Sequence, residues 1–474
     1  MDSCTEQEIL PEAERQVSQK QKLFVIAHSF PPATTPAANR SSRLLQYLKP
    51  EWSLEILTGM ADGFLDPETK VEVVQGWTPD KLYSLISKLK LEKFWKLLVW
   101  PDDNVFWLFP AIRRGYQLIK QSQANVIVVF IMPYSAALAG IVLKWMTGLP
   151  LVINLGDSLT CTDMHPSHPT WFHYQMNRWL EDFYIRQCDA IVYVSQRTIN
   201  RVKSRQPAKY HSKFHLSRGG IDLNSHVTVE KLESDNAAFN IVYTGGMNGW
   251  YQFYDTPSER VSLKGKFKAL YQAWLRLGRY SLTTIDFRSS SPVFVGKAVN
   301  QIVNQCTEWH GKIHVKVYGN QYPKAVVKRV LENENIDDIV SVFDRIPNHQ
   351  AIQIAQRADM LFLTLPERPD GSESCRISLK TYEYLMTDCP ILAAVPKGEN
   401  WDYLTDKPGV WLVDPTDTNQ MSKVIEHLAK SKFEGQPQRF DRSHLYEELS
   451  YEKKAQDFSK LLSEIVSKRK LGKS

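Results

Sequence analysis

In the first half of the chain, short continuous apolar runs alternate with amphipathic segments. The run Leu23–Ala27 ends in a proline-marked loop, and residues 39–48 then carry apolar positions at helical spacing. Residues 125–157 show strand, turn, helix and strand patterns in turn, and residues 188–205 repeat strand and helix. Strands that are apolar on both faces and alternate with helices predict a parallel sheet covered by helices on both sides.

The same rhythm restarts after Ser217–Asn224. Further apolar runs predict strands within residues 239–246, 313–321, 339–347, 358–366 and 390–396. The expected fold class is therefore α/β, with two doubly wound Rossmann-like domains and a ligand cleft between them, beyond the carboxyl ends of the strands. No GxGxxG motif follows a predicted strand, so a nicotinamide or flavin site has little support.

The domain limits follow from this pattern. We expect a polar, disordered segment over residues 1–21, an N-terminal domain over 22–225 and a C-terminal domain over 238–432. A long amphipathic helix over 440–470 is expected to pack back on the N-terminal domain, and a stretch around Asn248–Leu263 has the character of an insertion.

Length and composition restrict the class of protein. A chain of 474 residues is too long for one compact core. The net charge of +6 is compatible with a phosphorylated substrate or an anionic membrane, but no dense basic stripe favours nucleic acid. Six scattered cysteines show neither CxxC nor zinc spacing, and signal-peptide and membrane-spanning patterns are absent. These features predict a cytoplasmic protein, soluble or membrane-associated at the inner face.

The stretch Arg376–Pro396 carries the clearest chemistry. Ser378 is a good N-cap residue, so a helix is predicted to begin there and to lead into the strand predicted within residues 390–396. The free amides at the start of that helix would face the cleft. Such amides bind phosphate oxygens, and Lys380 adds a positive charge. Glu383 lies one turn further on the same face, where a carboxylate can accept hydrogen bonds from two ribose hydroxyls. The pattern predicts a nucleoside diphosphate site, although a capped surface helix with a solvated Lys–Glu pair also fits it.

These residues resemble family 4 glycosyltransferases, the retaining enzymes of GT-B fold. "SLKTYEYLMTDCPILAAVP" is similar to their C-domain signature, and "MPYSAALAGIVLKWMTGLPLVINLGDSLT" is similar to a Pro-Tyr-Ser subgroup. Other segments of residues 22–430 match in the family's order. The resemblance implies a sugar transferred from a nucleotide-diphosphate-sugar donor to a hydroxyl acceptor (glycan, polysaccharide or lipid-linked), with no metal, as in polysaccharide biosynthesis.

The resemblance also assigns roles to individual residues. It implies donor-binding roles for Gly245, Gly246, Arg345, Ser378, Lys380 and Glu383. It implies acceptor-side roles for Arg40 and Asn39, and catalytic roles for Asp157, Arg260 and Lys264.

The chain departs from the family pattern at several of these places. The family's first glutamate, eight residues before Glu383, is Cys375 here, and no arginine precedes Asp157. The insertion displaces the basic residues that should follow Gly246, which leaves Arg260, Lys264 and Lys266 as phosphate candidates.

Three further interpretations stay open. The chain could be a degenerate nucleotide-sugar-binding protein without turnover, or a nucleotide-sugar 2-epimerase, which needs a set of cleft carboxylates and histidines. Residues 87–100 form a basic amphipathic helix with Phe94 and Trp95 on its apolar face. That face fits either a peripheral membrane contact or the core of the domain.

Overall fold

A computed structural model of the chain describes most of its length. The described residues are 20–31, 36–60, 70–77, 80–89, 95, 99–161, 163, 167–223, 237–247, 249–251 and 263–471. Residues 1–19 of the expected disordered segment and most of the insertion therefore lie outside the described residues, whereas Gln21, the last residue of that segment, begins the first strand.

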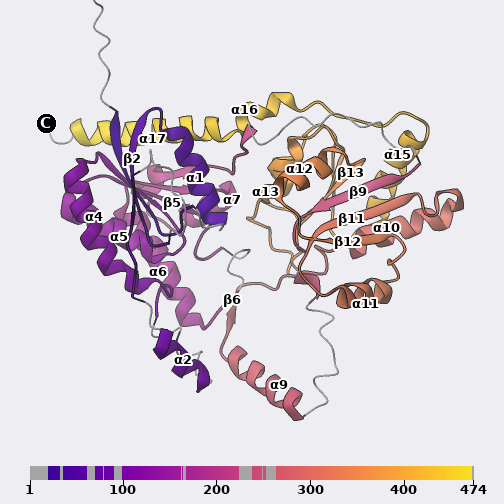
Figure 1. Cartoon of the computed structure of the whole chain (residues 1–474), viewed down its shortest axis with the longest axis horizontal. Helices are drawn as coiled ribbons and strands as arrows, with labels where there is room; N and C mark the ends of the chain where they lie inside the picture. The colour runs from indigo at the N-terminus through magenta and orange to yellow at the C-terminus, as the bar shows by residue number, and fades with distance from the viewer. Residues whose placement is uncertain are drawn as a thin grey trace, which may run out of the picture.

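The N-terminal domain is built on a seven-stranded parallel sheet with the order β3-β2-β1-β4-β5-β7-β8 (Figure 1). Its strands are β1 (Gln21–Ala27), β2 (Trp52–Thr58), β3 (Lys70–Val73), β4 (Val126–Phe130), β5 (Leu151–Gly156), β7 (Ala190–Tyr193) and β8 (Phe214–Leu216). All five residues of β4 and all six of β5 are buried, as the continuous apolar runs predict.

Helices cover both faces of this sheet. One face packs against α4 (Leu108–Ser122), α5 (Ser135–Thr147), α6 (Trp171–Gln187) and α7 (Gln196–Lys203). The other face packs against α1 (Pro36–Leu48) and the last helix, α17 (Tyr451–Leu471). Alternate residues of β1 divide between the two cores, Phe24 and Ile26 in one and Leu23 and Val25 in the other. Helix α2 (Asp80–Lys88) lies at the margin of the domain.

The second domain repeats the design with a six-stranded parallel sheet of order β12-β11-β9-β13-β14-β15. Its strands are β9 (Phe239–Thr244), β11 (Ile313–Asn320), β12 (Val340–Asp344), β13 (Met360–Thr364), β14 (Ile391–Ala394) and β15 (Val410–Val413). One core includes α10 (Pro292–Gln305), α11 (Lys324–Glu334) and α15 (Thr418–Phe433). The opposite core includes α12 (Asn348–Gln356), α13 (Leu379–Leu385) and α14 (Glu399–Leu404). The predicted pair of doubly wound α/β domains is thus confirmed.

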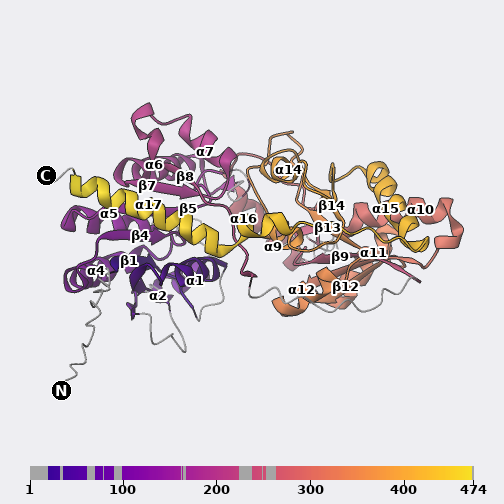
Figure 2. The ribbon, with the colours of Figure 1, turned by 90° about the horizontal axis from the view of Figure 1, so that it is seen from above.

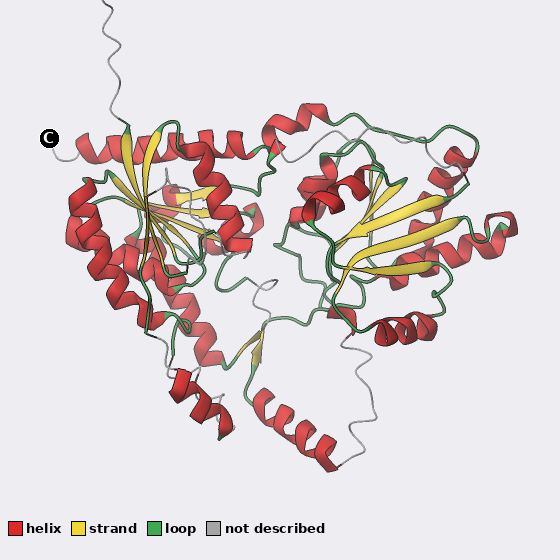
Figure 3. Ribbon diagram, in the orientation of Figure 1, coloured by secondary structure: helices red, strands yellow, loops and turns green. Residues whose placement is uncertain are grey.

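The two sheets lie side by side, each between layers of helices (Figure 3). After α15 the chain runs through α16 (Tyr446–Leu449) and returns to the first domain, where α17 lies along its surface (Figure 2). Among the described residues there is no helix whose length and hydropathy would let it cross a bilayer.

A small antiparallel ribbon also joins the domains. Strand β10 (Tyr280–Ser281) of the second domain pairs with β6 (Ser167–His168) of the first. Helix α9 (Leu263–Arg276) precedes this ribbon and lies at the lower edge of the molecule, apart from α12 and α13 (Figure 1).

Candidate functional site

The turn after β9 brings three of the predicted donor-binding residues together. Gly245 has a φ of +135°, and a Cβ at this position would lie 2.5 Å from Lys380 Nζ. Gly319, with a φ of +134°, packs so closely that its own Cβ would lie 2.6 Å from the Gly245 carbonyl oxygen. Only glycine fits both positions, and the result is a bare backbone surface with Gly245, exposed Gly246 and Lys380 around it.

Lys380 has a position suited to an anion. Its ammonium lies 5.2 Å from the centre of the Tyr243 ring. Within the part of the chain that the structure describes, no ion pair to a carboxylate is formed by Lys380. Its positive charge therefore remains available beside the glycine turn.

The start of α13 is fixed by a side chain that the sequence did not reveal. Ser378 is the N-cap residue, and its own side chain makes no capping hydrogen bond. Instead, Asn400 of α14 accepts hydrogen bonds at Oδ1 from the Ser378 amide (3.0 Å) and the Thr381 hydroxyl (2.6 Å). The Ser378 hydroxyl is thus not used to cap its own helix.

Glu383 lies one turn along α13 and is partly buried. Burial raises the pKa of its carboxyl, and the charges of Lys380 and Arg43 act in the opposite direction. Arg43 belongs to α1 of the first domain, so α1 and α13 face each other across the space between the domains.

A small pocket adjoins Glu383 at the carboxyl end of β9. It is lined by residues of β9, α12 and α13, namely Thr244, Asn348, Ala351, Ile352, Ala355, Glu383, Tyr384 and Thr387. Arg345 lies exposed in the connection between β12 and α12, just before the first of these α12 residues.

Arg40 reaches the carboxyl end of β5, next to Asp157. Arg40 donates a hydrogen bond from Nη2 to Asn154 Oδ1 (3.4 Å). Its Nη1 lies where a Cβ on Gly156 would come within 2.6 Å, and Gly156 has a φ of +73°. Asp157 follows directly and is exposed, as is Asn39. Arg40 and Asp157 therefore lie at the same edge of the first sheet.

The remaining two catalytic candidates have no described side chain. Arg260 lies outside the described residues, and only the backbone of Lys264 is described, in the first turn of α9. Because α9 lies apart from α13 in Figure 1, the backbone of Lys264 is not next to the glycine turn.

A buried carboxylate of the second domain holds the first domain in place. Glu399 accepts hydrogen bonds from the Ser195 hydroxyl (3.2 Å) and from the amides of Gln196 (3.1 Å) and Arg197 (2.9 Å), at the start of α7. It also pairs with Arg218 at 3.0 Å. A carboxylate at a helix N-terminus is favoured by the free amides and by the helix dipole, so Glu399 caps a helix of the other domain.

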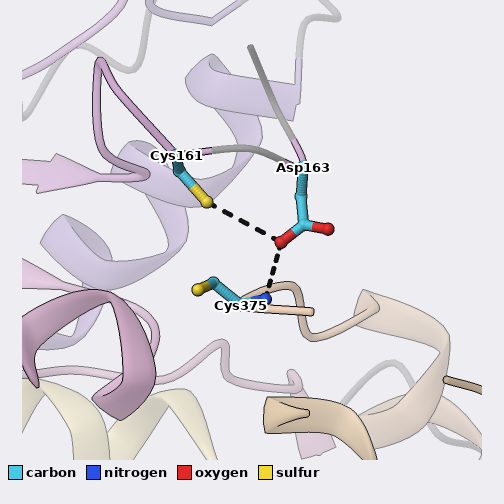
Figure 4. A group of neighbouring side chains, drawn as sticks. All are labelled: Cys161, Asp163 and Cys375. Atoms are coloured by element: carbon cyan, nitrogen blue, oxygen red, sulfur yellow. Dashed lines mark hydrogen bonds between the residues drawn. The ribbon is translucent and has the colours of Figure 1, made fainter. Parts of the chain in front are cut away.

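A second contact between the domains gathers groups of metal-ligating type. The Sγ atoms of Cys161 and Cys375 and a carboxylate oxygen of Asp163 all lie within 4.8 Å of one another (Figure 4). Asp163 accepts hydrogen bonds from the Cys375 amide (2.6 Å) and the Ser374 hydroxyl (3.1 Å), and it pairs with the buried guanidinium of Arg368. Since a guanidinium already neutralises Asp163, this cluster does not have the character of a cation site.

Two facing doubly wound domains, with their strands' carboxyl ends turned to the space between them, define the GT-B fold of glycosyltransferases. Residues 58–225 match the family model described as Glycosyltransferase Family 4, which confirms the predicted resemblance to that family over this part of the chain; the Pro-Tyr-Ser subgroup stays a prediction. A comparison with curated protein sequences finds no match.

Solved structures of similar fold cover nearly the whole chain. Anabaena HepE in complex with UDP and glucose has a TM-score of 0.55 and 12% identity, over 94% of this chain and 99% of that one. Sucrose-phosphate synthase from Thermosynechococcus elongatus has a TM-score of 0.59 and 11% identity, over 94% and 100%. Trehalose 6-phosphate synthase from Burkholderia multivorans has a TM-score of 0.58 and 10% identity, over 96% and 98%.

Proposed function

We propose that the chain is a glycosyltransferase that moves a sugar from a nucleotide-diphosphate-sugar to a hydroxyl acceptor with retention of configuration. The observation that carries the proposal is Lys380 above the glycine turn of Gly245, with Glu383 one helical turn away. The phosphates would contact Lys380 and the Gly246 amide. The ribose would contact Glu383, and the base would enter the pocket beside α12. The match to Glycosyltransferase Family 4 and the neighbour that binds UDP and glucose support this assignment.

The diphosphate leaving group would be stabilised by the protein itself. As the bond to the sugar breaks, negative charge develops on the diphosphate. The Lys380 ammonium and the Gly246 amide are positioned donors for that charge, whereas the Gly245 amide already donates to the Tyr318 carbonyl (2.6 Å). We propose that these groups fill the role that a divalent ion has in other transferases. Asp157 and Arg40, at the edge of the opposite sheet, would face the transferred sugar or the acceptor.

Calorimetric titration of the purified protein with nucleoside diphosphates and their sugar conjugates, without added metal, tests the site. The Lys380→Ala variant should lose about tenfold or more in affinity, because a charged hydrogen bond contributes about 1.5–3 kcal/mol. Lys328→Ala, on exposed α11, is the matched control and should bind as the wild type does. Unchanged affinity in Lys380→Ala would contradict the site, and a folded protein that binds nucleotide but never turns over a donor would favour the degenerate alternative.

Configuration and metal need are tested on the product. The anomeric signals of the product in proton NMR should match those of the donor, and turnover should persist in excess EDTA. An inverted anomer, or activity that returns only with a divalent ion, would contradict the corresponding part of the proposal.

We further propose that the protein contacts an anionic membrane through an aromatic strip on α5 and α6, which would suit a lipid-linked acceptor at the inner face. Trp145 and Trp179 are 59% and 57% exposed and flank Phe183, with ring centres 6.3 and 5.5 Å from it. Arg178 and Arg186 lie exposed on the same helix. Amphipathic surfaces with Trp and Arg bind the interface of anionic bilayers.

The nearby acids do not oppose this contact. Asp182 is paired with Arg205 at 2.9 Å and Asp189 with Lys144 at 2.6 Å, so the strip is surrounded by net positive charge. Of the predicted membrane helix, Trp95 is buried and donates to Asp103 (3.0 Å), which removes it as an anchor; Phe94 lies outside the described residues.

Vesicle sedimentation tests this surface. Wild type should sediment with phosphatidylglycerol vesicles and less with pure phosphatidylcholine, and the Trp145→Ala/Trp179→Ala double variant should stay in solution. Phe109→Ala, exposed elsewhere on the domain, is the control. Equal sedimentation of the double variant and the wild type would contradict the proposal. A wild-type dimer that the double variant converts to monomer would also contradict it, because the strip would then be a dimer interface.

A further inference from the structure

Cys161 and Cys375 come from different domains and meet at the domain boundary. Cys161 follows β5 of the first domain, and Cys375 lies three residues before the α13 cap in the second. Their sulfur atoms are within 4.8 Å of each other and lie on the same side of the Asp163 carboxylate (Figure 4). A disulfide has a sulfur separation of about 2.05 Å, so rotation of the two side chains and a small shift suffice to form one.

We propose that Cys161 and Cys375 form a reversible disulfide that joins the two domains when the protein meets a hydroperoxide. The Cys375 thiolate attacks one oxygen of hydrogen peroxide, which breaks the O–O bond, forms a sulfenic acid and releases hydroxide. The Cys161 thiol then attacks that sulfur, the S–S bond forms, and the sulfenic oxygen leaves as water. Overall, two thiols and one peroxide give one disulfide and two waters, and an added thiol reverses the bond.

The surroundings favour the thiolate at Cys375. A hydrogen bond with Cys161 is the main cause that lowers the pKa of the Cys375 thiol to about 6; burial opposes it, and the charges of Arg201 and Arg368 add to it. Two other described cysteines differ in this respect. Burial raises the pKa of Cys188 to about 12 and that of Cys389 to about 11, so these thiols stay protonated and unreactive.

The disulfide would fix the relative position of the domains. The cysteine pair is connected to the contact of Glu399 with α7. Ser374, next to Cys375, forms an isolated β-bridge with Gly398, and the Glu399 amide donates to the Ser374 carbonyl (2.8 Å). A covalent bond at Cys375 therefore locks a boundary that is otherwise held by hydrogen bonds and ion pairs. Loss of turnover on oxidation would follow if the cleft must open to admit the donor, and this consequence rests on the proposed glycosyl transfer. Formation of the disulfide does not depend on the proposed glycosyl transfer.

Peptide mapping of the full-length protein tests the bond directly. The protein is treated with hydrogen peroxide, free thiols are blocked, and the digest is analysed by mass spectrometry without reductant. We expect a loss of two hydrogens in the intact mass, a linked pair of peptides that contain Cys161 and Cys375, and loss of both signals after dithiothreitol. Cys306→Ser, a partly exposed cysteine elsewhere, should behave as the wild type does, and Cys161→Ser should give no linked peptides.

Other outcomes overturn the proposal. These are linkage of either cysteine to a different partner, or oxidation of Cys375 to sulfinic acid in the wild type without linked peptides. Protection of both thiols from alkylation by one equivalent of zinc would overturn it in favour of a metal site. Since the map is read on the wild type, a variant that fails to fold does not affect the result, and linked peptides in a protein without transferase activity would contradict the proposed function alone.

Discussion

At the scale of the residue, the absence of a side chain at Gly245 leaves the space that the Lys380 side chain occupies. Its φ of +135° lies where other residues are strained, and a Cβ would also collide with Lys380. The position therefore combines a conformational requirement with a steric one, and the two can be separated by experiment.

Gly245→Ala should lower the free energy of unfolding by about 2–4 kcal/mol and abolish nucleotide binding, because strain and a displaced Lys380 add together. Gly311→Ala is the matched control, since Gly311 also has a positive φ (+71°) but has nothing within 4 Å of its Cβ position. The control should lose only about 1–2 kcal/mol and keep its affinity. Urea denaturation measures the unfolding free energy of both variants, and calorimetric titration measures their affinity for nucleotide. Equal losses of stability and affinity in the two variants would contradict a role for the contact between Gly245 and Lys380.

Glu383 presents the opposite case, a side chain that works against stability. Burial raises the pKa of the Glu383 carboxyl in the folded state above its ordinary value. Between the unfolded-state and folded-state pKa values, the folded protein therefore binds more protons than the unfolded one. Stability therefore falls as pH rises through that window, and the penalty is fully present above the folded-state pKa of Glu383.

Glu383→Gln should accordingly be more stable than wild type at pH 7 and equal to it below the unfolded pKa, and it should bind nucleotide more weakly. Thermal denaturation across pH 4–8 measures the first effect, and calorimetry the second. Glu332→Gln, on exposed α11, should show neither. A variant less stable at pH 7 would mean that Lys380 and Arg43 outweigh the burial of the carboxyl.

At the scale of the element, α7 depends on a residue of the other domain for its first turn. Glu399 is 3% exposed and accepts from two α7 amides, and Arg218 pairs with it. Removal of a buried charged partner leaves the other groups without compensation, which costs about 3–5 kcal/mol.

Glu399→Ala should therefore destabilise the protein by about 3 kcal/mol, with the two domains unfolding in separate steps, as seen by calorimetric scanning. Asp402→Asn removes an exposed partner of Arg197 from the same helix and should cost under about 1 kcal/mol. A single cooperative transition in Glu399→Ala, at the wild-type temperature, would contradict a role in holding the domains together.

The elements themselves could be predicted from the sequence, whereas the contacts between domains could not. Buried parallel strands such as β4 and β5 are apolar at nearly every position, so local pattern suffices for them, and it also places the start of α13 at Ser378. The capping side chain that local pattern predicts there is wrong, because the Ser378 hydroxyl makes no capping hydrogen bond. Asn400 and Glu399 act on segments 22 and about 200 residues away, and no periodicity encodes such a partner. The glycine in "VYGNQ" was part of a predicted strand, but its requirement for a positive φ is visible only beside Gly245.

At the scale of the whole molecule, the last helix completes the core of the first domain. Tyr451, Phe458, Leu462, Ile465 and Val466 of α17 are buried against β1, β2 and α1, and the Trp52 indole donates to Ser459 (2.8 Å). Burial of each such side chain contributes about 1.5–3 kcal/mol, so their sum of roughly 10 kcal/mol equals the stability of a typical domain.

Truncation before Tyr451 should consequently leave the first domain unfolded, although the truncated chain still contains every strand of its sheet. Far-ultraviolet circular dichroism and limited proteolysis of the truncated chain measure this. A truncation before Lys468, where only exposed Leu471 among the described apolar side chains is lost, is the control and should fold. A protease-resistant first domain in the longer truncation would contradict the argument.

The path of α17 has a mechanical consequence as well. The chain crosses between the domains twice, and the crossings are joined: the Ile221 amide donates to the Leu449 carbonyl (2.7 Å), and the Tyr451 amide donates to the Ile221 carbonyl (3.0 Å). A single connection would let one domain rotate about it. Because the two connections are hydrogen-bonded to each other, one domain cannot rotate against the other without twisting both connections. The β6–β10 ribbon and the contact of Glu399 with α7 join the same two domains, so all of these links together resist torsion of one domain against the other.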